Sequence, residues 1–291
     1  MAGNQSQNIL QLTIDYALIV CRHGNVCKTF IIACRAATSR SRRCAYNENM
    51  SMIAGILESP ALRAATRLRE PLENGDRLTQ PEFHRRYESM PSHVRAELIG
   101  GIVYMASPLR MPHGTASSKL IAVLVNYEGA TSGVQAMDNT TTILSHDSEP
   151  QPDVALRLLP ERGGQSHINP EQYLVGAPEL IVEIAHSSEA IDLHAKKEDY
   201  RKAGVREYLV LCIEEQELRA FDLRANKPWA LPVDGIFRSR VFPGLWIDSR
   251  AAIAGDTRKL LATLRRGLKS PEHAAFVKPA KPRKTSRKRK P

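Results

Sequence analysis

The stretch PELIVEIA, at residues 178–185, has the length and the branched apolar side chains of a strand buried in a sheet. Because side chains alternate along a strand, Leu180, Val182 and Ile184 face one side of the sheet and Glu183 faces the other. A carboxylate inside so apolar a strand costs free energy unless it is paired, ligates a metal or reaches a cleft. Glu183 is therefore the first candidate functional residue of the chain.

The sequence on both sides of this strand predicts a mixture of helices and strands. Before it we expect a short helix through Phe83 and Tyr87, which begins with a capping box formed by Thr79 and Glu82. A β-hairpin that turns at Gly100-Gly101 follows. After the hairpin we expect a helix over residues 113–128 and strands over 140–144 and 152–158. After it we expect a helix over residues 191–203 that ends at Gly204, strands over 207–213, 217–223 and 242–247, and a helix over 251–268. This order predicts one α/β domain with a mixed central β-sheet flanked by helices.

Composition and charge indicate a globular protein whose ends differ from its middle. The 291 residues are 42% hydrophobic and 25% charged, and no apolar run approaches the ~20 residues of a membrane span, so we expect no membrane partner. The net charge of +10 lies at the ends. Residues 278–291 hold 8 basic and 0 acidic residues, whereas residues 50–277 hold 27 basic and 29 acidic residues. The folded part is therefore near neutral.

We expect both ends to lie outside the folded domain. Residues 1–49 form an uncertain N-terminal extension, residues 50–277 the domain, and residues 278–291 a disordered basic tail. Met50 is an alternative translation start that would remove the extension altogether. The tail either binds nucleic acid through its phosphates or only keeps the protein soluble, and its sequence leaves both open.

Cysteine usage indicates a reducing compartment, and hence a cytoplasmic protein. Cys212 is the one cysteine of the predicted domain, so no disulfide can hold that core together. The other four, at positions 21, 27, 34 and 44, lie in the N-terminal extension and lack the paired Cys-x-x-Cys spacing of structural zinc sites.

The candidate chemistry lies with carboxylates. The chain lacks the GxxxxGK[ST], GxGxxG, HExxH and GxSxG motifs, which are the commonest signals of NTPases, dinucleotide enzymes, zincins and α/β-hydrolases. Asp153 begins the strand PDVALRL, and two carboxylates on neighbouring strands can hold Mg²⁺ through oxygen alone. Lys196, on the next helix, shares a face with Asp192 and Tyr200 and supplies a cation for the same site.

Each of these residues also has a purely structural interpretation. Asp153 follows a proline and could be an ordinary turn residue, and a lysine on an amphipathic helix is usually solvated. His113 could satisfy backbone groups at a helix start. Asp192 and Lys196 could form no more than a surface ion pair worth ~0.3–0.5 kcal/mol.

Several separated motifs, in one order along the chain, also carry a resemblance. They are RAELIGGIVYMASP followed by His113-Gly114, then QPDVALRL, then PELIVEIAHSSEAIDLHAKKEDYRKAGVREYLVL. In these motifs the chain resembles the Uma family over residues 72–277. Its members are described as candidate restriction endonucleases of the PD-(D/E)xK nuclease superfamily. The resemblance implies a restriction endonuclease-like α/β fold.

The resemblance also implies a role for each residue of the motifs. Asp153 corresponds to the acid of the PD element and Glu183 to the acid that follows it. The superfamily lysine usually lies two residues after that acid, but Ala185 stands there, so Lys196 takes its part. Glu97 corresponds to a hairpin glutamate that approaches the metal or orients water. The implied catalytic residues are Asp153, Glu183, Lys196 and Glu97, with Asp153, Glu183 and Glu97 as metal ligands and His113 and Asp192 as further candidates.

The expected function is that of a Mg²⁺-dependent endonuclease that hydrolyses phosphodiester bonds in DNA, with Mn²⁺ as an alternative metal. Two other functions stay open: a catalytically inactive nucleic-acid-binding or structural module of the same fold, and a nuclease that acts on RNA or a small phosphodiester. A homodimer also stays open. His186 replaces the serine that usually follows the strand, which leaves the local loop geometry open.

Overall fold

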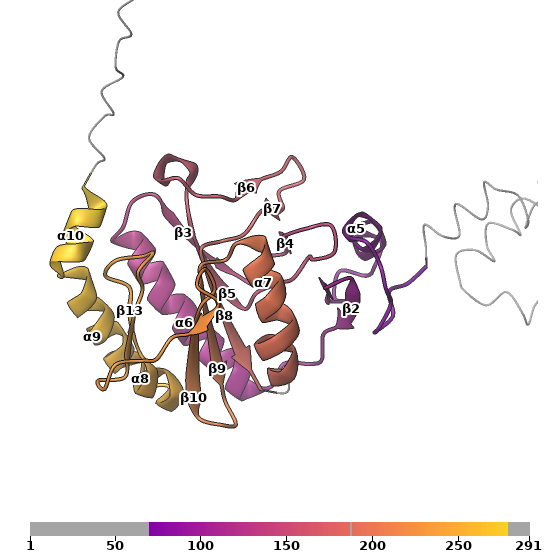
Figure 1. Ribbon diagram of the computed structural model, residues 1–291. Coiled ribbons are helices and arrows are strands. Elements are labelled where there is room, and N and C mark those ends of the chain that lie inside the picture. The colour runs from indigo at the N-terminus through magenta and orange to yellow at the C-terminus, as the bar shows by residue number, and fades with distance from the viewer. Residues whose placement is uncertain (1–69, 187, 279–291) are drawn as a thin grey trace, which may run out of the picture. The chain divides into compact units, whose positions relative to one another are not determined.

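The strand expected at residues 178–185 is β8 (Leu180–Ala185), which lies in the interior of a six-stranded sheet (Figure 1). The strand order is β11-β10-β9-β8-β5-β3. Strands β8 and β9 are parallel and the other neighbours are antiparallel, so the sheet is mixed, as the sequence predicts. The other strands are β3 (Val134–Asp138), β5 (Val154–Leu158), β9 (Glu207–Cys212), β10 (Glu217–Asp222) and β11 (Lys227–Pro228).

This computed structural model describes residues 70–186 and 188–278. The expected extension over residues 1–49, its cysteines, the alternative start at Met50 and the basic tail from residue 279 onward lie outside the described residues. Those expectations therefore stay predictions. Among the described residues, no helix combines the length and the apolar character that crossing a membrane requires.

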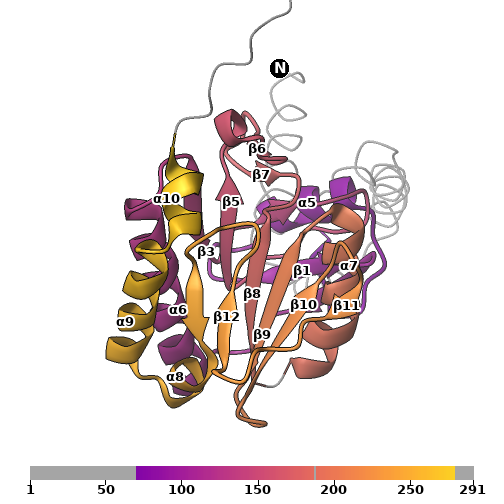
Figure 2. The same cartoon turned by 60° about the vertical axis from the view of Figure 1, so that its left-hand side comes forward.

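Helices cover both faces of the six-stranded sheet (Figure 2). On one face α6 (Met111–Gly129) packs against β8, and α8 (Ser249–Ala254) and α9 (Thr257–Leu268) belong to the same hydrophobic core as Leu180, Val182 and Ile184. On the other face η3 (Ile191–Lys196) and α7 (Lys197–Ala203) pack against Ile181 and Ala185. The alternation predicted for β8 is thus confirmed, and Glu183 belongs to the α7 face.

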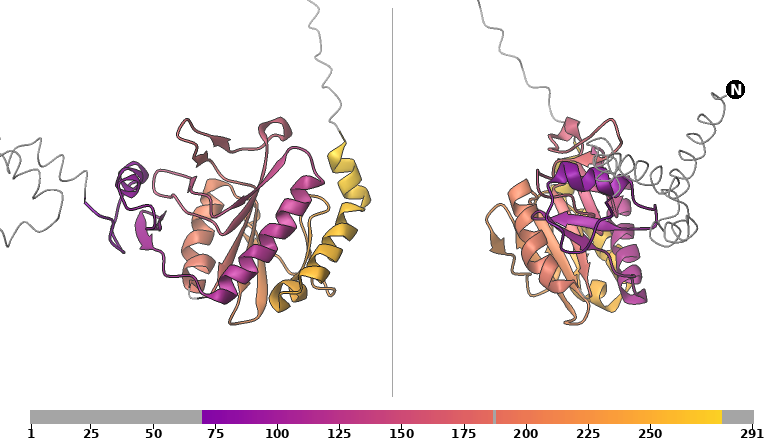
Figure 3. Two further views of the ribbon diagram at one scale, coloured as in Figure 1. Left: turned by 180° about the vertical axis from the view of Figure 1, so that it is seen from behind. Right: turned by 90° about the vertical axis from the view of Figure 1, so that its right-hand side faces the viewer.

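A hairpin and a short helix form a small layer beside the sheet (Figure 3). Strands β1 (Ala96–Ile99) and β2 (Ile102–Met105) are joined by Gly100 and Gly101, whose φ angles of 56° and 75° lie in the left-handed region that a type I′ turn requires. The backbone N–H of Gly100 donates to Asp199 Oδ2 at 2.7 Å, which ties the turn to α7. The predicted hairpin is confirmed, and it carries Glu97 on β1.

The helix predicted through Phe83 and Tyr87 is α5 (Gln80–Glu88), but its capping box is absent. Thr79 is the N-cap residue without a side-chain cap. The Glu82 carboxylate turns instead to Arg85 and Arg86, which donate to it at 2.6–2.9 Å. Three hydrogen bonds from two charged guanidinium groups are stronger than one bond from a backbone amide, so the Glu82 carboxylate turns to the arginines.

The helix predicted over residues 191–203 begins as a π-helix. η3 covers Ile191–Lys196 and α7 continues to Ala203, where Gly204 ends the helix with a φ of 96°, as predicted. Short π-helical segments often occur at functional sites because the wider turn redirects side chains. Here the π-helical segment includes Asp192 and Lys196.

Other boundaries differ from the prediction. The strand expected over residues 242–247 is shorter and shifted, and the helix expected over 251–268 is broken at Gly255, whose φ is 64°. The strand expected over 140–144 keeps two residues and joins another sheet. The remaining elements are β4 (Thr142–Ile143), β6 (His167–Ile168), β7 (Leu174–Val175), β12 (Ile236–Arg238), β13 (Trp246–Asp248), η2 (Pro160–Arg162) and α10 (Pro271–Val277).

Candidate active site

Asp153 and Glu183 contact each other where the start of β5 passes the end of β8. The backbone N–H of Asp153 donates to Glu183 Oε2 at 3.2 Å. In the other direction, the backbone N–H of Ile184 donates to Asp153 Oδ2 at 2.8 Å. This pairing follows from topology, because β5 and β8 are antiparallel neighbours with Val154 opposite Val182. The two carboxylates predicted on neighbouring strands therefore lie together.

Glu183 is held by two side chains from the helical segment above it. Lys196 Nζ lies 3.1 Å from Glu183 Oε1, and the Tyr200 hydroxyl donates to the same oxygen at 2.6 Å. Glu183 is 2% exposed and Tyr200 is fully buried, so water cannot replace either donor. The carboxylate inside β8 is thus paired, which is one of the three ways in which the cost of burying it can be offset.

Lys196 is the centre of a group of carboxylates. Besides Glu183, its Nζ lies 2.9 Å from Glu97 Oε2 and 3.8 Å from Asp192 Oδ1. The lysine is 6% exposed, so the interpretation as a solvated side chain is wrong. Asp192 is also buried, and the interpretation of its pairing with Lys196 as a surface ion pair is wrong for the same reason. Lys197 points elsewhere, with its ammonium 4.8 Å from the centre of the Phe221 ring.

Glu97 reaches this group from the hairpin. Its Oε1 accepts the backbone N–H of Gln151 at 2.6 Å, while its Oε2 faces Lys196. Gln151 precedes Asp153 by two residues, and its side-chain amide donates to the Tyr87 hydroxyl at 2.7 Å. The hairpin, α5 and the segment that leads into β5 are thereby connected through polar contacts.

His113, at the start of α6, approaches the site from the other face of the sheet. Its Nε2 lies 3.2 Å from Asp153 Oδ2. Its Nδ1 is buried and has no hydrogen-bond partner in the described part of the chain. The structure therefore places His113 beside the carboxylates, and not merely at a helix start satisfying backbone groups.

Burial and neighbouring charges shift the pKa values of Glu183, Asp192 and Asp153 in different directions. Burial raises the pKa of Glu183 well above its usual range, against the opposing charge of Lys196. Burial also raises the pKa of Asp192. For Asp153, burial is outweighed by the hydrogen bond and charge of His113, so its pKa is lowered. Burial disfavours the Lys196 ammonium, but the charges of Glu183 and Glu97 raise its pKa well above the usual value.

The donor set suits a hard divalent cation. Three carboxylates, those of Glu97, Glu183 and Asp192, surround Lys196, and Asp153 contacts Glu183, so acidic groups outnumber the one cation in this largely buried space. Asp153 Oδ1 accepts no hydrogen bond from any residue that the structure describes. Oxygen ligands and uncompensated negative charge are what Mg²⁺ and Mn²⁺ require. Asp153, Glu183 and Glu97 offer oxygen donors of the kind that such a cation uses, and their role as its ligands stays a prediction.

Some contacts of the site lay beyond sequence reasoning. The spacing placed Tyr200 on the face of Lys196, but the bond to Glu183 depends on how α7 packs. Ser188 Oγ donates to Asp192 Oδ2 at 2.5 Å, and nothing in the pattern singled out Ser188.

A second group of potential ligands lies at the end of β9. Atoms of Glu189, Cys212 and Glu215 fall within 4.8 Å of one another. Glu189 already pairs with Arg219 at 3.0 Å. This second group lies apart from the contacts described for Asp153 and Glu183, and it serves below as a control.

Comparisons with known proteins concern the family and the fold of the chain. Residues 80–250 match the sequence profile of the Uma2 family, described as "Putative restriction endonuclease". A crystal structure from Anabaena variabilis, described as "a putative nuclease belonging to DUF820", is similar with a TM-score of 0.51 and 13% identity, over 61% of this chain and 98% of that one. At this identity the likeness concerns the fold, and it agrees with the restriction endonuclease-like architecture. No curated protein matches the chain.

Proposed function

The chain belongs to the Uma2 family, whose profile matches more than half of its length, and from this premise we propose that it is a metal-dependent endonuclease that hydrolyses phosphodiester bonds in DNA. The observation that carries the proposal is the contact between Asp153 and Glu183 beside Lys196. Carboxylates on adjacent strands with a buried lysine match what phosphodiester hydrolysis needs: a cation site and a positive charge beside it.

The proposed ligands of the cation are Asp153, Glu183 and Glu97. When bound, a divalent cation supplies Lewis acidity to a phosphoryl oxygen and favours the ionised form of a nearby water. Mg²⁺ is the proposed ion and Mn²⁺ the alternative, because both prefer oxygen ligands. The contact between Asp153 N–H and Glu183 Oε2 keeps the two carboxylates together before any cation arrives.

The chain's own side chains would hold charge and orient the ligands. Lys196 keeps Glu183 and Glu97 close to each other, and its ammonium would stabilise negative charge on the transferring phosphate. Tyr200 fixes Glu183 in one orientation. His113 fixes one oxygen of Asp153, so that the other is directed away from the backbone contact.

The substrate is proposed to be DNA, with RNA as the competing substrate that the experiment must distinguish. The folded part carries almost no net charge, so generic attraction to phosphates comes mainly from the basic residues after position 277. Such attraction does not read bases. The proposal therefore includes no sequence specificity.

The test is cleavage by the purified full chain. Supercoiled plasmid, single-stranded DNA and single-stranded RNA are each incubated with Mg²⁺, Mn²⁺ or EDTA. Wild type is compared with Glu183→Gln and with Glu171→Gln, which alters an exposed glutamate. We expect metal-dependent nicking of plasmid that Glu183→Gln abolishes and Glu171→Gln retains. Equal behaviour of wild type and Glu183→Gln in every condition would overturn the proposal. Cleavage of RNA alone would show that the substrate is RNA and not DNA.

A further inference from the structure

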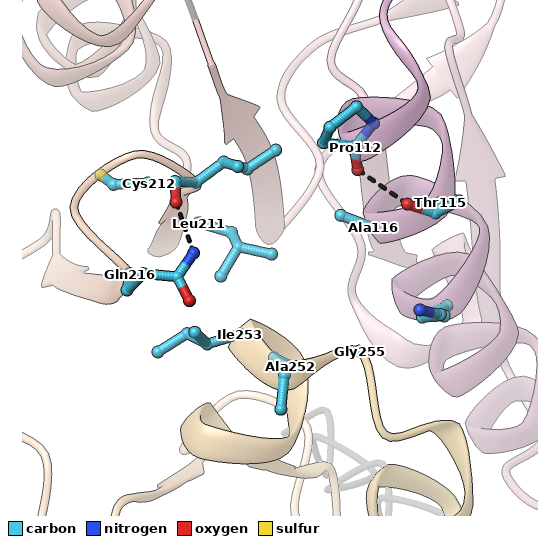
Figure 4. Close-up of a pocket in the computed structure, with 12 residues that line it drawn as sticks. Pro112, Thr115, Ala116, Leu211, Cys212, Gln216, Ala252, Ile253 and Gly255 are labelled. Atoms are coloured by element: carbon cyan, nitrogen blue, oxygen red, sulfur yellow. Dashed lines mark hydrogen bonds between the residues drawn. The ribbon is translucent and has the colours of Figure 1, made fainter.

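A pocket lies between the first turns of α6, the end of β9 and α8 (Figure 4). Its volume is about 250 Å³, slightly below the ~300–1,000 Å³ of sites that enclose drug-sized ligands. Leu211 and Ile213 form one wall and Ala252 and Ile253 another. A space of this size takes at most one nucleotide, and not a longer segment of a polymer.

Lys119 is the one charged residue among those that line the pocket. It is half-buried, and it makes no ion pair or hydrogen bond with any residue in the described part of the chain. Its Nζ lies against Gly255, where a Cβ atom would collide with it. The glycine therefore leaves room for an ammonium group that has no anionic partner of its own.

The pocket and the carboxylate site lie at the same end of the sheet. His113, which contacts Asp153, is followed two residues later on α6 by Thr115, a pocket residue. In the sheet, Cys212 of the pocket pairs with Ala185, two residues after Glu183 and thus about 7 Å farther along the strand. Leu211 and Glu183 belong to opposite faces of the sheet. A nucleic-acid strand that reaches both the pocket and the carboxylate site would therefore cross the end of the sheet.

We propose that this pocket is a subsite that takes one nucleotide of the substrate strand next to the scissile phosphate, with Lys119 on its phosphate and Leu211, Ile253 and their neighbours against its base or sugar. The inference rests on the proposed nuclease function, because it assigns the pocket to the same substrate. Charge complementarity favours this occupant: an unpaired ammonium suits a phosphate, and the aliphatic walls suit the apolar surface of a base or sugar. Thr115 and Gln216 supply hydrogen-bonding groups beside it.

The test measures binding without cleavage. Full chains that carry Glu183→Gln are titrated with fluorescent single-stranded and duplex oligonucleotides between about 50 and 200 mM salt. The first comparison adds Lys119→Met. The second adds Ala254→Tyr, which places a large side chain at an exposed position of the pocket. The control adds Lys227→Met, which removes an equal charge at β11, three strands away from β8.

We expect Lys119→Met to weaken binding at least ~3-fold and to reduce the salt slope by about 0.7–0.9, the value of one lost phosphate contact. Ala254→Tyr should also weaken binding, but it should change the salt slope less than Lys119→Met does. Lys227→Met should change both the affinity and the slope less than Lys119→Met does. If Lys119 only supports the end of α8, Lys119→Met lowers the melting temperature but leaves affinity and slope unchanged, which overturns the inference.

Two further outcomes separate this inference from the proposed function. If a mononucleotide binds the pocket as tightly as the oligonucleotides do, the pocket is a separate nucleotide site and the inference is overturned. If wild type nicks plasmid while Lys119→Met binds as the control does, the subsite fails and the nuclease function stands. If wild type does not cleave any substrate and the oligonucleotides do not bind, both fail.

Discussion

Lys196 Nζ lies 3.1 Å from Glu183 Oε1, and both side chains are almost completely buried. The sequence positions are thirteen apart, one in the interior of a sheet and the other on the helical segment that covers it. Removing one partner of such a pair leaves the other charge buried without compensation, which costs about 3–5 kcal/mol. The pair is therefore important to the fold as well as to the proposed chemistry.

Lys196→Met should destabilise the protein by about 3–5 kcal/mol, or roughly 6–20 °C in melting temperature for a domain of this size. The reason is that several carboxylates lose their shared cation. The matched control is Lys197→Met, which loses only a cation–π contact with Phe221 worth ~0.5–1 kcal/mol. Calorimetry of both variants checks the prediction. Equal melting temperatures for the two would contradict the assignment of Lys196 as the buried partner.

Tyr200→Phe should cost about 1.5–3 kcal/mol, the range for a hydrogen bond to a charged group. The hydroxyl that is lost donates to Glu183 Oε1 at 2.6 Å in a fully buried place. Tyr208→Phe is the control, because its hydroxyl donates to the neutral carbonyl of Asp192 and should cost about 0.5–1.5 kcal/mol. Urea unfolding of the two variants gives the comparison. A larger loss in Tyr208→Phe would mean that Glu183 does not depend on Tyr200.

Glu207→Gln should make stability less dependent on pH. Burial raises the pKa of Glu207, although Ser239 Oγ and two backbone N–H groups donate to its carboxylate. The folded state therefore holds this proton more tightly than the unfolded chain. The contribution of Glu207 to stability is present below its unfolded pKa and is lost as pH rises through its raised folded pKa.

The amide of Glu207→Gln can keep these contacts, with its oxygen toward the backbone donors and its NH₂ toward Ser239. Relative to wild type, the variant should gain stability as pH rises from about 4 to 7. Urea unfolding at several pH values measures this difference. The exposed Glu171→Gln serves as the reference. A difference between wild type and Glu207→Gln that is constant with pH would contradict the prediction.

Gly267→Ala should destabilise the protein by about 1–3 kcal/mol, although alanine is the better helix former. Gly267 lies on α9, and a Cβ there would overlap the carbonyl oxygen of Gly244 and approach the Trp246 ring. Gly129→Ala, in α6, meets no atom within 4 Å and should stabilise by up to ~1 kcal/mol. Thermal unfolding shows whether the two substitutions have opposite signs. A stabilising Gly267→Ala would show that α9 is not packed this closely.

The sequence predicts those parts of the fold whose signals are local. The alternation around Glu183 is readable because β8 is buried on both faces, and the hairpin is readable because Gly100-Gly101 suits only a few turns. Strand β3, with the sequence VQAMD, was not predicted, since it is a short edge strand without clear alternation and depends on β5 for its pairing. The break at Gly255 was missed because one glycine within an apolar periodic pattern is compatible with a continuous helix.

The sequence predicted which residues form the candidate site, but it did not predict which atoms of these residues contact one another. The residues Asp153, Glu183, Glu97 and Lys196 come together as the motifs suggest. The contact of Glu97 with Lys196 joins segments 99 positions apart, so it follows from tertiary packing alone. The capping box at Thr79 failed for a different, local reason, because the arginines three and four residues after Glu82 compete for its carboxylate.

The central claim is that Asp153 and Glu183 hold a divalent cation, and binding of Mn²⁺ to the full chain, measured by titration calorimetry, tests it most directly. Wild type should bind Mn²⁺, and Asp153→Asn and Glu183→Gln should each lose this binding while staying folded by circular dichroism. Glu189→Gln, in the second group of ligands near Cys212, should bind as wild type does. Binding that survives in both Asp153→Asn and Glu183→Gln, or that only Glu189→Gln removes, would contradict the account.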